Sequence, residues 1–454
     1  MKFVKTVLAA SLAMVFAAQA QAAVSPQEAA RLGTSLTQVG AEKAGNADGS
    51  IPAYNGGLTT PPASFKAGDS MRPDPFASEK PVLVIDGKNV DQYKGLLTAT
   101  TVELAKRFPT FRVDVFPTHR TVSLPQAILD NGVKNASGAK SLEGGLAIDN
   151  VLPGIPFPIP QSGNEAMWNF LLRYQGVSIS SKYDSWNVDS AGVPSLATTG
   201  QANISYPIYE NLSQPISSAD VYYQMKLAYT GPARRAGEAI MLKDAANPLQ
   251  QPRRAWQYLP GQRRVKLAPS LAYDTPNPGT AGAGTYDDVF VFNGALDRYD
   301  WKLVGKKEMY IPYNSYKLDS PKLKYDDIVK AGHINQDLTR YELHRVWEVI
   351  GTVKPNERHI YAKRHMYIDE DSWQVALADH YDGRGQLWRV AEGHAQYYYD
   401  HQAQAYTLEA LYDIIAGRYI ALGMKNEEKH SFEFGFEAKA ADYTPSALRA
   451  EGVR

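Results

Sequence analysis

The sequence of 454 residues contains no cysteine. This absence excludes disulfide bonds, thiolate zinc sites, iron–sulfur clusters and cysteine nucleophiles. The formal net charge is zero, from 48 basic and 48 acidic residues, so the chain lacks the basic surface that neutralises nucleic-acid phosphates. The G-x-S-x-G, H-E-x-x-H and P-loop signatures are also missing. We therefore predict a protein that is not an enzyme, takes no cofactor, binds no metal and contacts no nucleic acid.

The first 22 residues have the pattern of a secretory signal peptide. Lys2 and Lys5 precede an apolar run over residues 7–18, and the sequence AQA at 20–22 offers the small residues of a cleavage site. An alternative cut lies two residues earlier. The apolar run is shorter than the roughly 20 residues that span a bilayer. We expect cleavage after Ala22 and export to the periplasm of a Gram-negative cell.

The chain that remains after cleavage carries no signal for membrane attachment. Removal of residues 1–22 leaves 46 basic and 48 acidic residues, a formal charge of −2. No cysteine follows the cleavage site to accept a lipid, and no later segment approaches eighteen consecutive apolar residues. We expect residues 23–454 to form a single large β domain that is neither lipidated nor integral to the membrane.

Strand patterns dominate the chain beyond residue 176. Four strand-like runs at 344–353, 358–368, 372–381 and 386–399 follow one another with short polar turns between them, which predicts an antiparallel meander. Strands and helices do not alternate along the sequence, so a parallel sheet is not expected. The segment 272–286 is rich in glycine, alanine, proline and threonine, and we predict a mobile loop there.

Helical patterns are few. Residues 23–110 read as an extended loop and helix region with one longer helix over 90–108. A second helix is predicted over 162–174, because Ser162 can cap it and Glu165 occupies the capping-box position. That helix is apolar nearly all round, which is typical of a helix that is deeply buried or covers an apolar surface.

Aromatic residues are abundant, with seven tryptophans and twice as many tyrosines as phenylalanines. Many of them can be cross-strand pairs in the core, and the others suit a concave site for a bulky apolar ligand. Four arginines also flank Trp256 and Tyr258. They form either a solvated hairpin or a contact for an anionic head group or partner protein: Arg253, Arg254, Arg263 and Arg264.

Five stretches together resemble a family of proteobacterial periplasmic proteins labelled "outer membrane lipoprotein-sorting protein": residues 41–57, 153–169, 258–269, 297–314 and 344–390. The resemblance implies a fold similar to the Lol lipoprotein carriers, which is a strongly curved antiparallel sheet forming a half-open barrel, with helices over its concave face around an apolar cavity. It also implies association with a resistance-nodulation-division type exporter and an outer-membrane partner.

These observations favour a periplasmic carrier that binds a hydrophobic, lipid-like molecule such as an acyl chain and transports it with an inner-membrane exporter. One alternative is a non-catalytic scaffold of an envelope transport complex. A weaker one is a hydrolase that uses Asp369, Glu370 and Asp371, although adjacent acids in a turn point in different directions. The ligand-contact candidates are Trp168, Phe170, Leu171, Trp256, Tyr258, Trp301, Trp347, Trp373 and Trp388.

Overall fold

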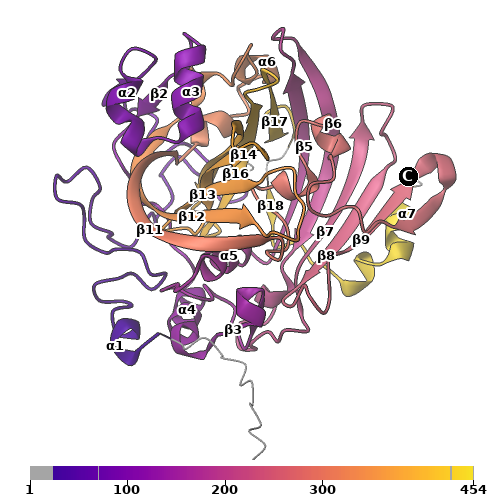
Figure 1. The fold of residues 1–454 in the computed structure, drawn as a ribbon, viewed down its shortest axis with the longest axis horizontal. Coiled ribbons are helices and arrows are strands. Elements are labelled where there is room, and N and C mark those ends of the chain that lie inside the picture. Colours follow the sequence, from indigo (N-terminus) through magenta and orange to yellow (C-terminus); the bar gives the residue numbers. More distant parts are fainter. Residues whose placement is uncertain (1–23, 70, 430–431, 453–454) are drawn as a thin grey trace, which may run out of the picture.

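The computed structural model describes residues 24–69, 71–429 and 432–452. The expected signal peptide, residues 1–22, lies outside the described residues. Of the eighteen strands in the described residues, sixteen form one large sheet, so the predicted mainly β fold is confirmed (Figure 1). None of the helices in this part of the chain combines the length and the apolar character needed to cross a membrane.

The strands up to residue 267 are β1 (Leu83–Ile85), β2 (Val113–Val115), β3 (Lys140–Leu142), β4 (Ala147–Asp149), β5 (Ser178–Val188), β6 (Pro194–Ser205), β7 (Val221–Gly231), β8 (Ala239–Ala245), β9 (Arg254–Leu259) and β10 (Arg264–Leu267). The later strands are β11 (Tyr299–Pro312), β12 (Tyr341–Val353), β13 (Lys363–Asp369), β14 (Val375–Tyr381), β15 (Leu387–Tyr398), β16 (Ala403–Asp413), β17 (Arg418–Met424) and β18 (Glu433–Phe434). The α-helices are α1 (Pro26–Ala29), α2 (Val90–Tyr93), α3 (Ala99–Arg107), α4 (Gln126–Gly138), α5 (Gly163–Leu171), α6 (Tyr325–Ile328) and α7 (Pro445–Gly452).

The large sheet runs in the order β1-β2-β12-β13-β14-β15-β16-β17-β5-β6-β7-β8-β9-β10, with β11 beside β12 and β18 beside β5. Its pairings are antiparallel, apart from a single parallel pair between β12 and β2. The predicted four-strand meander is confirmed by β12 to β15, which pair in sequence order, and β16 extends it by one strand. Among the described strands the two ends of this path do not pair, so the sheet is not closed and a half-open barrel is not confirmed.

The two halves of the sheet meet through a pairing between distant parts of the chain. β17 pairs with β5, with Tyr419 opposite Val188. This pairing brings the meander next to the strands β5 to β10 in one continuous surface (Figure 1). We call the face of the sheet that carries α5 the inner face.

The predicted helix over 162–174 is confirmed as α5, which ends three residues earlier. Ser162 accepts a hydrogen bond from the Glu165 backbone N–H over 3.2 Å, and the helix packs against β11 and β12. Gly163 makes the close approach possible, because a Cβ at this position would lie 2.5 Å from the backbone carbonyl of Trp301.

The single helix predicted over 90–108 is wrong, because the chain forms α2, a short 3₁₀ turn and α3 instead. Leu97 is extended between them. Thr98 then caps α3 by accepting a hydrogen bond from the Thr101 N–H over 3.0 Å, and the Asp379 carboxylate accepts another from the Ala99 N–H over 3.0 Å. The new helix therefore begins where its first N–H groups meet acceptors.

The C-terminal helix α7 covers the opposite, outer face of β7 to β9 (Figure 1). Leu448 of α7 and the preceding Tyr443 pack with Met241 and Tyr258 in a small separate core. The outer face at this end of the sheet is thus closed by the chain itself, while the inner face is left to form the cavity described next.

Candidate functional site

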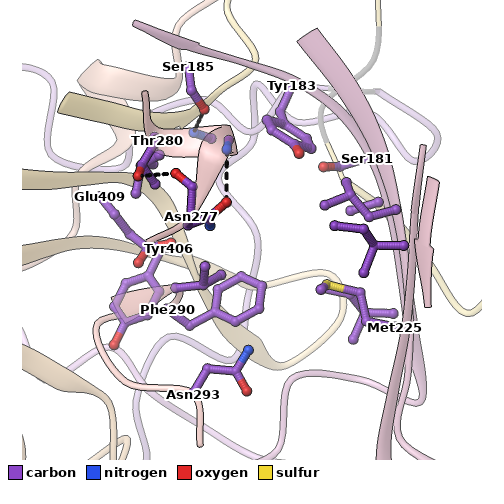
Figure 2. A pocket seen from close by; sticks show the side chains of 18 of the residues that line it. Ser181, Tyr183, Ser185, Met225, Asn277, Thr280, Phe290, Asn293, Tyr406 and Glu409 are labelled. Atoms are coloured by element: carbon purple, nitrogen blue, oxygen red, sulfur yellow. Dashed lines mark hydrogen bonds between the residues drawn. The ribbon is translucent and has the colours of Figure 1, made fainter. Parts of the chain in front are cut away.

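A large apolar cavity lies on the inner face of β5 to β8 (Figure 2). Its empty volume is about 1040 Å³, which includes space open to solvent. Alternate residues of the strands point into it, since side chains i and i+2 share one face of a strand. Its apolar wall is formed chiefly by Ile204, Met225, Leu227, Ile240 and Leu242.

The opposite wall is formed by residues 277–293, here called the inner segment, together with β16 and β17. The inner segment overlaps the stretch 272–286 that was predicted to be a mobile loop, and several of its polar groups are buried and hydrogen-bonded. Thr198 of β6 donates to the Gly279 carbonyl over 2.9 Å. Asn277 accepts from the Gly279 N–H over 2.8 Å through its side chain, and its carbonyl accepts from the Thr280 hydroxyl over 2.7 Å.

Two ion pairs anchor the middle of the inner segment to β13. The fully buried Arg364 lies 2.9 Å from Asp287 and 3.4 Å from Asp288. His359 Nε2 lies 3.0 Å from the Asp287 carboxylate. Burial opposes ionisation of Asp287, but the Arg364 charge and the His359 contact outweigh it and lower the pKa of the carboxyl. The segment is therefore fixed to the sheet by charges that remain ionised.

Glu409 of β16 is the carboxyl group that lines the cavity. Its Oε2 accepts a hydrogen bond from the Val291 N–H over 2.8 Å. Burial raises the pKa of Glu409 to about 7, against the opposing effect of that backbone bond. Phe290 and Val291 both have left-handed backbones, with φ of 58° and 65°, a conformation that a β-branched residue rarely adopts. Glu409 thus holds a strained turn of the inner segment at the cavity wall.

None of the nine aromatic and apolar candidates from the sequence is among the described residues that line this cavity. Trp168 and Leu171 of α5 instead line a smaller cavity of about 320 Å³, which includes space open to solvent. Phe170 is fully buried in the core beneath α5. Trp301 of β11 packs edge-on against Phe292, with ring centroids 5.5 Å apart. The structure therefore gathers these residues around α5, next to the cavity.

The other candidates are dispersed over the sheet. Trp256 and Tyr258 lie on the outer face beneath α7. Trp347 and Trp373 stack with ring centroids 5.9 Å apart, and Trp388 donates to the Asp413 carboxylate over 3.1 Å. The wall of the cavity on β6 to β8 was missed because the prediction rested chiefly on tryptophans, whereas this wall is mostly aliphatic. The signal that could have found this wall is the alternation of apolar residues at 225/227 and 240/242.

The four arginines predicted to form one cluster are separated by the structure. The half-buried Arg253 forms a bidentate pair with Asp244, at 2.8 and 2.6 Å, and also donates to Asn293 of the inner segment. Arg254, Arg263 and Arg264 are exposed on the hairpin of β9 and β10. The prediction of a head-group or partner contact on this hairpin therefore rests on the three exposed arginines.

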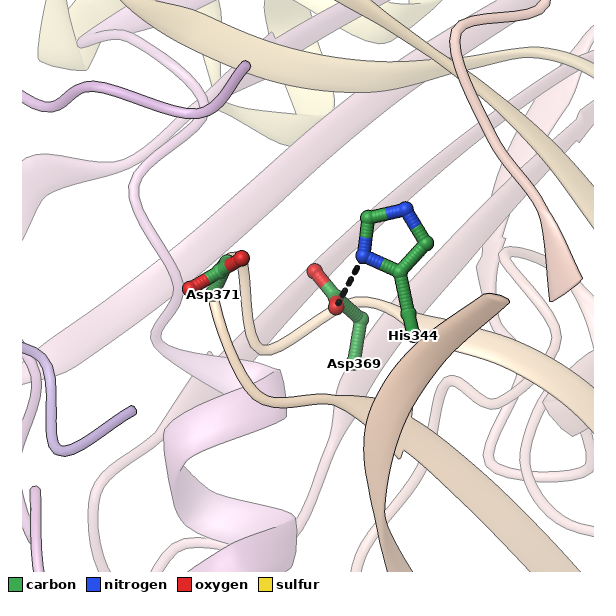
Figure 3. A group of neighbouring side chains, drawn as sticks. All are labelled: His344, Asp369 and Asp371. Carbon is green, nitrogen blue, oxygen red and sulfur yellow. Dashed lines mark ion pairs between the residues drawn. The ribbon is translucent and has the colours of Figure 1, made fainter. Parts of the chain in front are cut away.

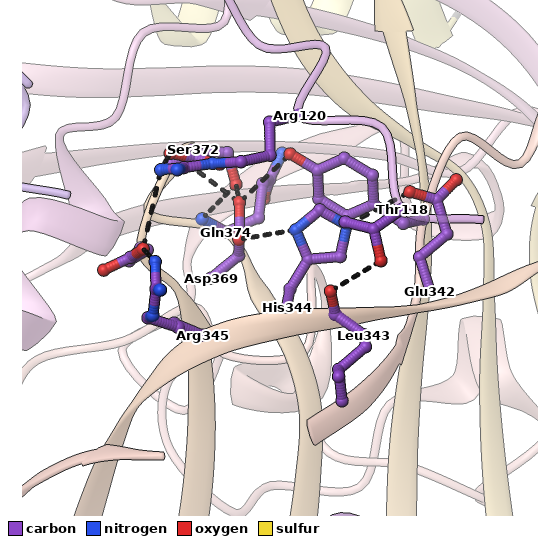
Figure 4. A network of polar contacts seen from close by, with 12 residues as sticks. Thr118, Arg120, Glu342, Leu343, His344, Arg345, Asp369, Ser372 and Gln374 are labelled. Carbon is purple, nitrogen blue, oxygen red and sulfur yellow. Dashed lines mark hydrogen bonds and ion pairs between the residues drawn. The ribbon is translucent and has the colours of Figure 1, made fainter. Parts of the chain in front are cut away.

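The acidic turn after β13 lies in a buried network of ion pairs and hydrogen bonds (Figure 4). Arg120 donates to both oxygens of Asp371 over 2.8 and 2.7 Å. Glu370 pairs with Lys306 over 2.7 Å, and Asp369 accepts from the Ser372 hydroxyl over 2.6 Å. These carboxylates point to different partners, and the arrangement ties the turn to the N-terminal segment.

His344, Asp369 and Asp371 are the one group in the described chain whose spacing could suit a metal ion (Figure 3). One atom of each lies within 4.8 Å of the others, and His344 Nδ1 is 3.9 Å from Asp369 Oδ1. Both Asp371 oxygens already bind Arg120, and His344 Nε2 faces Glu342 over 3.1 Å. Burial and the neighbouring Asp371 charge raise the pKa of Asp369 to about 6. Arg120 therefore supplies a positive charge at this cluster.

Known proteins similar to this chain include one close relative and several partial structural matches. The chain is 52% identical to the Uncharacterized protein PA3922 of Pseudomonas aeruginosa over 451 residues, which cover 99% of this chain and 98% of the relative. An outer membrane lipoprotein-sorting protein domain from Vibrio parahaemolyticus matches 63% of this chain and 97% of its own, with 14% identity and a TM-score of 0.43.

Two further structures match a similar share of the chain. A DUF1329 family protein from Desulfovibrio piger shows 12% identity and a TM-score of 0.42, over 63% of this chain and 97% of its own. The LolA superfamily protein NE2245 from Nitrosomonas europaea shows 11% identity and a TM-score of 0.36, over 62% and 95%. A family described as "Protein of unknown function (DUF1329)" matches residues 84–449. The chain belongs to this DUF1329 family, which confirms the resemblance that its sequence motifs predicted.

Proposed function

We propose that the protein is a periplasmic carrier that binds a hydrophobic, lipid-like molecule and performs no catalysis. The observation that carries this proposal is the apolar cavity on the inner face of β5 to β8. Ligand sites in proteins are mostly apolar, with a few polar groups that orient the ligand. Here the polar groups come from the inner segment, from Glu409 and from Ser181 and Ser185 of β5, beside the aliphatic wall.

The chemistry of such a carrier is non-covalent. Transfer of an acyl chain from water into the cavity contributes about 0.8 kcal/mol for each methylene that is buried. A chain of eight to ten methylenes therefore contributes about 6–8 kcal/mol, from which the cost of association is subtracted. Release then requires a competing site of similar apolar character, such as a membrane or a second protein.

The cellular setting of the proposal comes from the sequence. The signal-peptide pattern over 1–22 supports export to the periplasm, and the motif resemblance supports work with a resistance-nodulation-division type exporter and an outer-membrane partner. Affinity purification of the tagged protein from detergent-solubilised envelope tests these partners. Recovery of neither protein above an untagged control would contradict that part of the proposal.

The carrier function is tested by native mass spectrometry and lipid extraction of protein purified from the periplasm. We expect a co-purifying apolar molecule in the wild type. Ala202→Trp places an indole in the cavity, since Ala202 lines it, and should abolish the adduct. Gln201→Trp is the matched control, because the neighbouring residue points to the exposed outer face of the same strand. A ligand that persists in Ala202→Trp would overturn the proposal, as would a wild type that never carries one.

A further inference from the structure

Arg173 differs from the other buried arginines in having no acidic partner. Seven arginines are buried in the described chain, and six of them form an ion pair with Asp or Glu: Arg72, Arg120, Arg235, Arg340, Arg364 and Arg389. Arg173, which is 4% exposed, lies within 4.0 Å of no carboxylate among the described residues. Burial of a cation without an anion costs several kcal/mol, so the missing partner needs an explanation.

The hydrogen bonds of Arg173 leave its charge uncompensated. Nη1 donates to the Phe170 carbonyl over 2.6 Å and Nη2 donates to Gln175 Oε1 over 3.2 Å. Both acceptors are neutral, and Nε has no partner. The guanidinium also lies over the Phe170 ring at 4.1 Å. An arginine can donate five hydrogen bonds in a planar fork, so donors remain for an acceptor that the chain does not supply.

A small recess that is partly open to solvent is lined by Arg173. Arg173 and Gln175 lie at its polar side, with Tyr206, Tyr222 and Tyr223 around them. Gln175 donates to the Tyr206 hydroxyl over 2.8 Å, so the tyrosine and amide groups are fixed in place. The recess is therefore a preformed polar site built around one unneutralised cation.

The recess and the large apolar cavity share two walls. Phe290 and Asn293 of the inner segment line both spaces, and Figure 2 shows these two side chains at the lower end of the cavity, near Tyr406. The Arg173 guanidinium lies 5.8 Å from the centre of the Tyr406 ring, which also lines the cavity. A molecule with a polar head and an apolar chain matches this pair of adjoining spaces.

Glu409 is an acidic group that the Arg173 charge influences, because that charge lowers the pKa of the Glu409 carboxyl. Its carboxyl is already held by the Val291 N–H, and no ion pair joins it to Arg173 within 4.0 Å. Lys425, which also acts on Glu409, donates to two backbone carbonyls and lies 3.7 Å from Asp319. Arg173 is thus the cation beside the cavity whose charge is not already paired.

We infer that Arg173 binds the carboxylate head of a single-chain amphiphile whose hydrocarbon chain lies in the apolar cavity. This inference rests on the proposed carrier function and names its ligand class as long-chain carboxylic acids. Arginine suits the role because its fork matches both oxygens of a carboxylate. Phe290, which lines both spaces, would then lie between the carboxylate head and the hydrocarbon chain.

The test is isothermal titration calorimetry of delipidated protein with dodecanoate and with dodecan-1-ol at pH 7. We expect Arg173→Gln to weaken dodecanoate binding at least about tenfold, as loss of a charged hydrogen-bonding partner does, and to change dodecanol binding less than about twofold. Arg173→Lys keeps the charge and should recover part of the loss. Lys182→Gln removes an exposed cation on the outer face of β5 and should leave both affinities unchanged.

The outcomes separate this inference from the proposed function. If the wild type binds neither amphiphile, the carrier function itself fails. If it binds both and Arg173→Gln weakens neither selectively, the carrier stands and the role of Arg173 is refuted. If Arg173→Gln shows no cooperative thermal transition, the inference is tested on the wild type alone. The wild type must then bind dodecanoate at least about tenfold more tightly than dodecylammonium. If millimolar acetate displaces dodecanoate from the protein, the site binds free small anions, and the inference of an amphiphilic ligand is refuted.

Discussion

The Val291 N–H donates to Glu409 Oε2 over 2.8 Å, and this bond joins a left-handed turn of the inner segment to β16. Val291 is buried, with a φ of 65°, so the sheet holds a β-branched residue in a conformation of high energy. Glu409 is itself 8% exposed. A buried carboxyl therefore controls how firmly one wall of the cavity is attached.

The first prediction concerns the pH dependence of stability at Glu409. Its pKa is raised to about 7 in the folded protein, against about 4.5 in the unfolded chain, so the folded state binds the proton more tightly. The stabilisation is complete below pH 4.5 and is lost as the pH rises through 7. Relative to Glu409→Gln, the wild type should lose about 3 kcal/mol of unfolding free energy across this range.

Urea unfolding at several pH values between 4.5 and 8 measures that difference. Burial also raises the pKa values of Asp369 and Asp379 to about 6, so the wild type alone does not isolate one group. Subtraction of the Glu409→Gln curve removes the contributions that both proteins share. A difference between the two curves that stays constant with pH would contradict the assignment.

The second prediction concerns Arg120, which neutralises the acidic turn after β13. Arg120→Met leaves Asp371 and Glu370 buried without this cation, and should cost about 3–5 kcal/mol of unfolding free energy. The double variant with Asp371→Leu should lose less than the sum of the two single variants, since the remaining charge is also removed. Lys106→Met breaks an exposed pair with Asp91 and should cause no measurable loss. Equal effects of the two cation replacements would disprove the buried network as a stabilising unit.

The meander could be predicted because its turns are determined by residues that are close together in the sequence. The turn between β14 and β15 shows this: the Asp382 side chain accepts from the N–H groups of Arg384 and Gln386, both over 2.9 Å, and Gly385 takes a φ of 76°. Aspartate and glycine are chosen for such turns by their own chemistry. The N-terminus of α5 was predictable for the same reason, from Ser162 and Glu165.

The cavity could not be predicted, because it depends on pairings between distant residues. Tyr419 pairs with Val188 across more than two hundred residues, and no local pattern records that register. The position of the inner segment depends on Arg364 and Asp287, which are also far apart in sequence. Its glycines and prolines suggested mobility, whereas tertiary contacts determine that it is buried.

The third prediction concerns the contact between α5 and β11. A Cβ on residue 163 would lie 2.5 Å from the Trp301 carbonyl, and backbone atoms in a sheet cannot move aside cheaply. Gly163→Ala should therefore cost about 1–3 kcal/mol of unfolding free energy. Gly95→Ala is the control, because its Cβ meets no atom within 4 Å, and should change stability by less than about 0.5 kcal/mol. Thermal or urea unfolding gives both values, and equal stabilities would show that α5 can shift without cost.

The fourth prediction links ligand binding to stability. A molecule that binds only the folded protein raises stability by RT ln(1 + [L]/Kd), so delipidation of the wild type should lower its Tm. The Ala202→Trp variant, whose indole occupies the cavity, should have the same Tm before and after extraction. Gln201→Trp should respond as the wild type does, since its side chain lies on the outer face. If all three proteins respond alike, the stabilising molecule binds outside the cavity of β5 to β8.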